Sequence, residues 1–145
     1  MDDLRATRDK IEIQELLYRY ARACDSRDWA LLTSVFTDDA QLDYSSVGRE
    51  VGSRDEIVGW LEQGLSQLPW SQHFITNIEI ELDGDRAKVQ AMFYNPMQLP
   101  GMADMSYCGG RYNHDVVRTP DGGWKSEKLV EQNQWFVNPI PGTHE

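Results

Sequence analysis

The sequence predicts a single α+β domain, because two kinds of hydrophobic periodicity follow one another along the chain. In the first third, apolar residues recur at three- and four-residue steps, which is typical of helices packed on one face. From residue 73 onward apolar and polar residues alternate, and turn sequences separate the alternating segments. Helices followed by antiparallel strands indicate helices on one face of a curved, mostly antiparallel sheet. We expect one domain over residues 1–145 whose helices and sheet enclose a pocket, and whose uncovered face favours self-association.

Composition and charge exclude several classes of function. The 145 residues are 40% hydrophobic, enough for the core of one domain. The net charge of −10, from 24 acidic and 14 basic residues, repels polyanions, so nucleic acid is not an expected partner. No apolar run approaches the roughly 20 residues that cross a bilayer, and the N-terminus lacks the pattern of a signal peptide. We expect a cytoplasmic protein with no membrane partner.

The first helix is predicted by one apolar stripe. Its members are Ile13, Leu16, Leu17, Tyr20, Ala21 and Cys24. Asp25 follows at the helix end, where the negative pole of the helix dipole should raise its pKa unless a cation or hydrogen-bond donor compensates. Ser26 or Asp28 can cap a second helix, which we expect to end at residues 37–39. The inward residues of this second helix are Trp29, Leu32 and Phe36.

A half-buried strand and a third helix come next. Residues 40–45 alternate, and Tyr44 shares the apolar side. A loop with Gly48 and Gly52 leads to a capping box formed by Ser53 and Glu56. The third helix is buried through Ile57, Trp60, Leu61 and Leu65, and Pro69 ends it.

Four longer strands complete the predicted sheet. They span residues 73–82, 86–95, 105–118 and 124–137. An Asp-Gly turn at residues 83–85 joins the first two, and residues 119–123 form another hairpin turn. A loop with Pro96, Pro100 and Gly101 connects the middle pair, and the tail with Pro139 and Pro141 is irregular. The strand pattern indicates a mostly antiparallel sheet.

His73 is the most informative residue for chemistry, because a histidine that meets a carboxylate in an apolar interior can transfer protons near neutral pH. Its position conflicts with the alternation of its strand. The apolar side of that strand holds Phe74, Ile78, Ile80 and Leu82, which places His73 on the opposite side. His73 can face the interior only if the strand bulges near Thr76 and Asn77, or if its outer half packs differently.

Other reactive side chains suggest weaker sites. Cys24 and Cys108 have no metal-ligand spacing, and we expect two buried free thiols. His114 and Asp115 are adjacent in a strand, so they point to opposite faces and cannot pair simply. Neither these residues nor His73 show the spacing of a metal site, and we expect no metal. Residues 109–110, a Gly-Gly pair inside a strand, suggest a sharp bend or room for a pocket.

Four segments of the chain resemble a known family. They read YARACDSRDW at 20–29, FTDDAQLDY at 36–44, QHF at 72–74 and DGGWK at 121–125. Together they resemble the SnoaL-like branch of the nuclear-transport-factor-2 superfamily, and the similarity extends over nearly the whole chain. Scytalone dehydratase, bile-acid 7α-dehydratase and hexachlorocyclohexane dehydrochlorinase are the members it most resembles. The resemblance implies a cone-shaped barrel with a deep apolar pocket and no cofactor, commonly trimeric and sometimes dimeric.

The resemblance also implies roles for particular residues. Asp25 and His73 match the proton-transferring pair of those lyases, Tyr44 matches a tyrosine that holds the substrate carbonyl through water, and Tyr20 matches an active-site tyrosine. Three departures argue against an identical substrate. Gly110 stands where scytalone dehydratase has a second histidine, and Gln132 and Tyr20 replace an arginine and a lysine of the dehydrochlorinase. The expected substrate contacts are Trp60, Phe93, Tyr112, Gln132 and Trp135, of which the last two could instead lie in a subunit contact.

The sequence therefore supports a main hypothesis and two alternatives. The main one is a dehydratase-type lyase that needs no metal or organic cofactor and acts on a small, hydrophobic, cyclic, hydroxylated carbonyl compound. The alternatives are an isomerase or cyclase of a polyketide or steroid, and a module that binds a small molecule or assembles without catalysis. Each residue also has a structural interpretation. His73 could be a strand-end histidine that lies in solvent or makes a structural hydrogen bond. Asp25 could simply end a helix, and Tyr20 and Tyr44 could be ordinary core aromatics.

Overall fold

The computed structural model describes residues 3–141. The helices are α1 (Asp3–Ser26), α2 (Trp29–Ser34), the 3₁₀ helix η1 (Ser45–Val47) and α3 (Arg54–Leu65). The strands are β1 (Phe36–Tyr44), β2 (Arg49–Ser53), β3 (Trp70–Ser71), β4 (Phe74–Asp83), β5 (Arg86–Gln98), β6 (Ser106–Arg118) and β7 (Trp124–Val137). The expected α+β class is confirmed. No helix within the described range is long and apolar enough to span a membrane.

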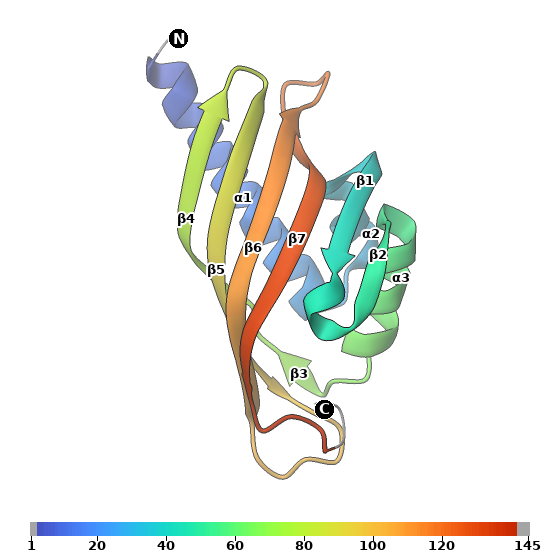
Figure 1. The fold of residues 1–145 in the computed structure, drawn as a ribbon. Coiled ribbons are helices and arrows are strands. Elements are labelled where there is room, and N and C mark those ends of the chain that lie inside the picture. The colour runs from blue at the N-terminus through green and yellow to red at the C-terminus, as the bar shows by residue number, and fades with distance from the viewer. Residues whose placement is uncertain (1–2, 142–145) are drawn as a thin grey trace.

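The strands form one mixed, strongly curved sheet. Its order is β2-β1-β7-β6-β5-β3, and β4 also pairs with β5. The neighbours from β4 to β7 are antiparallel, whereas β1 runs parallel to β7. Figure 1 shows α1 lying behind the long strands, with α2 and α3 beside β1 and β2. This half-barrel places the end of α1 close to the segment between α3 and β4.

Two expected boundaries were wrong in the first half of the chain. The second helix ends at Ser34, and Phe36 begins β1, whose main-chain pairing to β7 starts there. A buried Phe36 fits both a helix face and a strand face over so short a stretch, so periodicity could not choose between them. The expected loop around Gly48 contains β2, which pairs antiparallel with β1 after a left-handed turn at Gly48 (φ 90°). Its polar residues lack the alternation that reveals a strand.

Two more differences lie around the start of β4 and the end of β5. The chain forms the short strand β3 before His73, and β5 continues through Pro96 to Gln98. Although proline has no N–H to donate, the carbonyl of Pro96 accepts a hydrogen bond from the N–H of Gln72 at 3.0 Å. The proline therefore lies within the paired region.

A bulge in β4 provides one of the arrangements under which His73 could face the interior. Pairing with β5 shifts between Thr76 and Glu79, and Asn77 adopts a left-handed conformation with φ 50°. Beyond the bulge Ile78 keeps the inward side, whereas before it Ile75 packs on the core and Phe74 is 48% exposed. Phe74 was therefore wrongly assigned to the inward set. Before the bulge, the odd-numbered residues of this segment face the interior. His73 therefore lies on the inward side.

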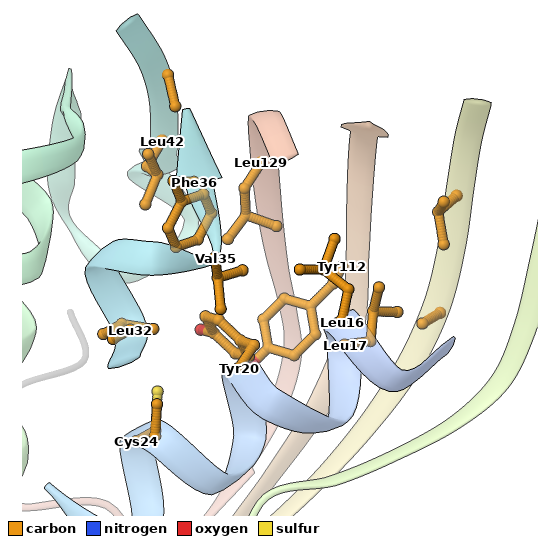
Figure 2. Packing of buried hydrophobic residues seen from close by; sticks show 14 of the residues in the cluster. Leu16, Leu17, Tyr20, Cys24, Leu32, Val35, Phe36, Leu42, Tyr112 and Leu129 are labelled. Atoms are coloured by element: carbon orange, nitrogen blue, oxygen red, sulfur yellow. The ribbon is translucent and has the colours of Figure 1, made fainter. Parts of the chain in front are cut away.

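The core lies between α1 and the inner face of the sheet. Figure 2 shows Tyr20, Leu16 and Leu17 of α1 near Tyr112 and Leu129 of the sheet. The further fully buried side chains include Ile13, Cys24, Leu32, Val35, Phe36, Leu42 and Ile57. The predicted stripe of the first helix is thus its buried face, and both cysteines are buried free thiols as expected.

One buried ion pair anchors the N-terminal half of α1. The carboxylate of Asp9 is 2% exposed and accepts two hydrogen bonds from the Arg118 guanidinium, at 3.0 and 2.7 Å. The indole N–H of Trp124 adds a third bond at 3.3 Å. Such bidentate pairing satisfies a buried carboxylate and holds the helix in one orientation. The ion pair thus fixes the orientation of α1, whose last turn places Asp25 at the other end of the sheet.

Candidate active site

Asp25 and His73 are in direct contact. Asp25 occupies the last turn of α1, and His73 lies between β3 and β4. The ring Nδ1 of His73 is 2.6 Å from Oδ1 of Asp25, and the backbone N–H of His73 donates to Oδ2 at 2.7 Å. The side chain of His73 is 9% exposed, and that of Asp25 is 25% exposed. Two bonds from one residue therefore hold both oxygens of the carboxylate.

The hydrogen bonds assign the tautomer of His73. Burial by itself would raise the pKa of Asp25, but hydrogen bonds and charge interaction with His73, together with a bond from Ser71, lower it below the ordinary value. The pKa rise that was expected at the helix end without a compensating donor does not occur, because these donors compensate. An ionised carboxylate can only accept, so Nδ1 carries a proton, and in the neutral ring the lone pair is on Nε2. Nε2 is thereby left as a base.

Arg27 supports the contact between Asp25 and His73 through hydrogen bonds. It has a left-handed backbone conformation (φ 59°), which turns its side chain back across the end of α1. Its Nη1 donates to the Cys24 carbonyl at 2.6 Å and to Oγ of Ser71 at 2.9 Å. Ser71 in turn donates to Oδ1 of Asp25 at 3.1 Å. The guanidinium therefore positions the carboxylate through one hydroxyl.

Tyr20 lies beside the His73 ring, and two other tyrosines contact Tyr20. The hydroxyls of Tyr20 and Tyr44 are hydrogen-bonded to each other. The Tyr20 ring makes edge contacts with His73 and Tyr112, at centroid distances of 6.4 and 5.2 Å. Burial raises the pKa of all three phenols well above the ordinary value, so they stay protonated and act as neutral donors.

Two of the expected substrate contacts join this aromatic group. Trp60 makes an edge contact with Tyr44 at 5.5 Å, and Phe93 stacks on Tyr112 at 4.4 Å. These rings lie in the interior beside Tyr44 and Tyr112. A hollow of about 500 Å³ lies elsewhere, between the β4–β5 turn and the start of β7, and its lining includes neither Asp25 nor His73.

Gln132 and Trp135 do not lie in this interior, contrary to the expectation that they line the pocket. Gln132 is exposed, and its side-chain carbonyl accepts a hydrogen bond from Asn113 at 3.1 Å. Trp135 is 42% exposed and contacts Tyr94 and Tyr107 at about 6 Å on the outer face. The cause is the strand's alternation, which turns Gln132 outward beside an inward Glu131. A bulge between the pairs Gly109–Trp135 and Gly110–Asn133 then changes the face presented by the end of β7.

His114 forms a separate, structural contact. It is 3% exposed, and its Nδ1 lies 2.9 Å from Oγ of Ser126. Burial lowers the pKa of His114 to about 4, so the ring is neutral at physiological pH. Asp115 points the other way and lies 3.5 Å from the ammonium of Lys88. The prediction that His114 and Asp115 do not pair is confirmed.

Sequence reasoning missed three polar residues of this region. Arg27 was missed because its role depends on a left-handed backbone conformation that the sequence does not predict. Glu131, 6% exposed, shares the inward parity of Leu129, and that alternation was a usable signal. Ser46 comes from the short η1 segment and donates a hydrogen bond to Oε1 of Glu131. In residues 3–141 no group of three or more His, Cys, Asp or Glu side chains is arranged to hold a metal ion.

Comparison with known proteins adds a family and a set of similar folds. The family described as "SnoaL-like domain" matches residues 5–130. An uncharacterized protein of Mycobacterium tuberculosis is 40% identical over 124 residues, covering 85% of this chain and 84% of that protein. A hexachlorocyclohexane dehydrochlorinase from Novosphingobium barchaimii superimposes with a TM-score of 0.82 at 22% identity, covering 97% and 96% of the two chains. A candidate scytalone dehydratase from Novosphingobium aromaticivorans gives 0.81 at 19% identity, covering 95% and 90%.

Proposed function

The chain belongs to the SnoaL-like domain family, and from this membership and the contact between Asp25 and His73 we propose that it is a dehydratase-type lyase. The substrate class is a small, hydrophobic, cyclic carbonyl compound with a hydroxyl group on the carbon β to the carbonyl. The observation that carries the proposal is the 2.6 Å contact that leaves Nε2 of His73 as a base. Similar folds that bear the names dehydrochlorinase and dehydratase support the same reaction class, an elimination.

The proposed reaction starts with proton abstraction. Nε2 of His73 removes a proton from the carbon beside the carbonyl, and the Asp25 carboxylate stabilises the imidazolium that forms. The carbonyl oxygen gains negative charge at the same time. Tyr44, bonded to Tyr20, donates to that oxygen, and because both phenols keep their protons at neutral pH they can act as donors without competing as bases. Expulsion of the hydroxyl group then completes the elimination.

An isomerase is the second candidate, and the paired hydroxyls of Tyr20 and Tyr44 favour it equally. They would stabilise an enolate whether or not a group departs from the next carbon. The mass of the product separates the two reactions, since a lyase releases water and an isomerase leaves the mass unchanged. A homo-oligomer, trimeric or else dimeric, and a cytoplasmic location stay predictions.

The test uses a β-hydroxytetralone, a bicyclic hydroxyketone whose dehydration gives a naphthol that is detected by its absorbance. We expect His73→Ala and Asp25→Asn each to lower the rate by about 10²-fold or more, the lower end of what a positioned base contributes. Asp104→Asn, at an exposed loop carboxylate, serves as the control and should keep the wild-type rate. Exogenous imidazole should restore part of the activity of the alanine variant. Full activity in either site variant, with an unchanged circular dichroism spectrum, would refute the proposal.

A further inference from the structure

Glu131 is a buried carboxyl that the proposed proton abstraction does not use. It is 6% exposed and lies on the inner face of β7, where it pairs across the sheet with Tyr112 of β6. On the other side, the parallel pairing of β1 with β7 reaches Asp43 and Val130. The next residues along the two strands, Tyr44 and Glu131, therefore lie beside one another. Glu131 thus stands between two tyrosines of the candidate site.

The contacts of Glu131 distinguish its two carboxyl oxygens. Ser46 accepts a hydrogen bond from the N–H of Asn133 at 2.9 Å and donates its own hydrogen to Oε1 of Glu131. Because Oε1 accepts this hydrogen, a protonated Glu131 carries its proton on Oε2. Burial raises the pKa of Glu131 above the ordinary value, although the bonds from Ser46 and Asn133 oppose the rise. The titratable groups that interact with this carboxyl are Asp43 and Tyr44 of β1, His73, and Cys108 and Tyr112 of β6.

A second buried group at this end of the interior has an unused acceptor. Asn95 of β5 is 5% exposed, and its Oδ1 has no hydrogen-bond partner in the described structure. Its neighbour across the sheet is Cys108, whose thiol interacts with Asn133, two residues beyond Glu131. Leaving a buried acceptor unpaired is unfavourable, so this atom favours a ligand that brings a hydrogen-bond donor. A hydroxyl group of a bound molecule would supply the missing donor.

The charge of this region limits which leaving group it suits. Within residues 3–141, no lysine or arginine is among the buried charged residues, which include Asp9 and Glu131. A chloride or carboxylate that departs as an anion would be repelled by an ionised Glu131. A neutral hydroxyl that leaves as water needs instead one proton donor, which a protonated carboxyl provides.

Given the proposed dehydratase, on which this step rests, we propose that Glu131 is a further catalytic residue that protonates the departing hydroxyl group, while Oδ1 of Asn95 accepts a hydrogen bond from a substrate hydroxyl. The electrons of the broken C–H bond form the new C=C bond as His73 takes the proton. The C–O bond breaks, its electron pair stays on the oxygen, and that oxygen takes the proton of Glu131 and leaves as water. The imidazolium and the carboxylate left behind are restored by proton return through solvent.

The test compares Glu131→Gln with wild type on two substrates. Glutamine keeps an acceptor for Ser46 but cannot donate an acidic proton. On a β-hydroxytetralone we expect a loss of about 10²-fold or more. On the acetate ester of the same alcohol, whose leaving group needs no proton, the rate should be nearly unchanged. Glu79→Gln, at an exposed carboxylate of β4, is the matched control.

Three further readouts separate this role from a structural one and from failure of the proposed function. The glutamine variant should still exchange the carbon-bound proton in D₂O, whereas His73→Ala should not. Glu131→Asp, which keeps an acidic proton, should retain more dehydration activity than Glu131→Gln if Glu131 acts as an acid. Infrared difference spectra of wild type against Glu131→Gln should show the carbonyl stretch of a protonated carboxyl at neutral pH.

Each opposite result overturns the role of Glu131. These results are an ionised Glu131 in the infrared spectrum, an unchanged dehydration rate in Glu131→Gln, and equal losses in Glu131→Asp and Glu131→Gln. A wild type that exchanges protons without releasing water would contradict both the dehydratase and this role. A wild type with neither reaction would reject the proposed function as a whole, and the role with it.

Discussion

The Gly109–Gly110 pair allows a prediction in which two adjacent alanine substitutions should differ strongly. A Cβ atom added to Gly110 would lie 1.9 Å from the backbone carbonyl oxygen of Gln132 and 3.0 Å from the ring of Phe93. A Cβ added to Gly109 would lie 2.2 Å from the ring of Trp135. The first obstacle is main chain within the β6–β7 pairing, whereas the second is a side chain that is 42% exposed on the outer face. Only the second can move without disturbing the sheet.

The expected magnitudes follow from these contacts. Gly110→Ala must displace the carbonyl by about 1 Å or more, and overpacking of this kind costs typically 1–3 kcal/mol. We expect a loss near the upper end, about 3 kcal/mol, which lowers Tm by roughly 6–12 °C at about 2–4 °C per kcal/mol. Gly109→Ala should cost less than about 1 kcal/mol, because Trp135 can rotate into solvent. The absence of a side chain at Gly110 therefore leaves room for the backbone of β7 and the ring of Phe93.

The assay is urea denaturation and thermal unfolding of both variants, followed by tryptophan fluorescence and circular dichroism. Equal losses in the two variants, or a Gly110→Ala protein as stable as wild type, would refute the argument that the Gln132 main chain cannot yield. Because five tryptophans contribute to the fluorescence, the two probes should agree before a free energy of unfolding is assigned.

Two further predictions concern the carboxylate of Asp25 and its support. Because the folded protein lowers the pKa of Asp25, its ionised form stabilises the fold above the unfolded-state pKa of about 3.9, and that contribution is lost as the pH falls through the folded value. The stability difference between wild type and Asp25→Asn should therefore shrink below about pH 4 in urea titrations, and a difference that grows there would contradict the assigned pKa shift. Arg27→Lys keeps the charge but not the forked contacts to Cys24 and Ser71, and we expect about 1–3 kcal/mol less stability together with a lower kcat. If its kcat and its pH–rate profile match those of wild type, Arg27 supports the fold without positioning Asp25.

The sequence by itself determined the class of fold and the order of its elements. The apolar stripe that ends at Cys24 and the alternation after residue 73 are both local periodicities. A local periodicity can be read directly from the sequence. The likeness to SnoaL-like proteins extended this to the half-barrel and singled out Asp25 and His73. The conflict between the alternation of β4 and an inward His73 was also visible, and a bulge near Asn77 was one of the arrangements that could resolve it.

Only the tertiary structure decided which of these side chains share one site. The separation of Asp25 and His73 depends on the orientation of α1, which the buried pair of Asp9 and Arg118 holds against the far end of the sheet. The inward side chain of β7 is Glu131 rather than Gln132, because alternation and a bulge, not residue type, set the face. Such choices depend on contacts between residues distant in the chain, and no local pattern of the sequence encodes those distances.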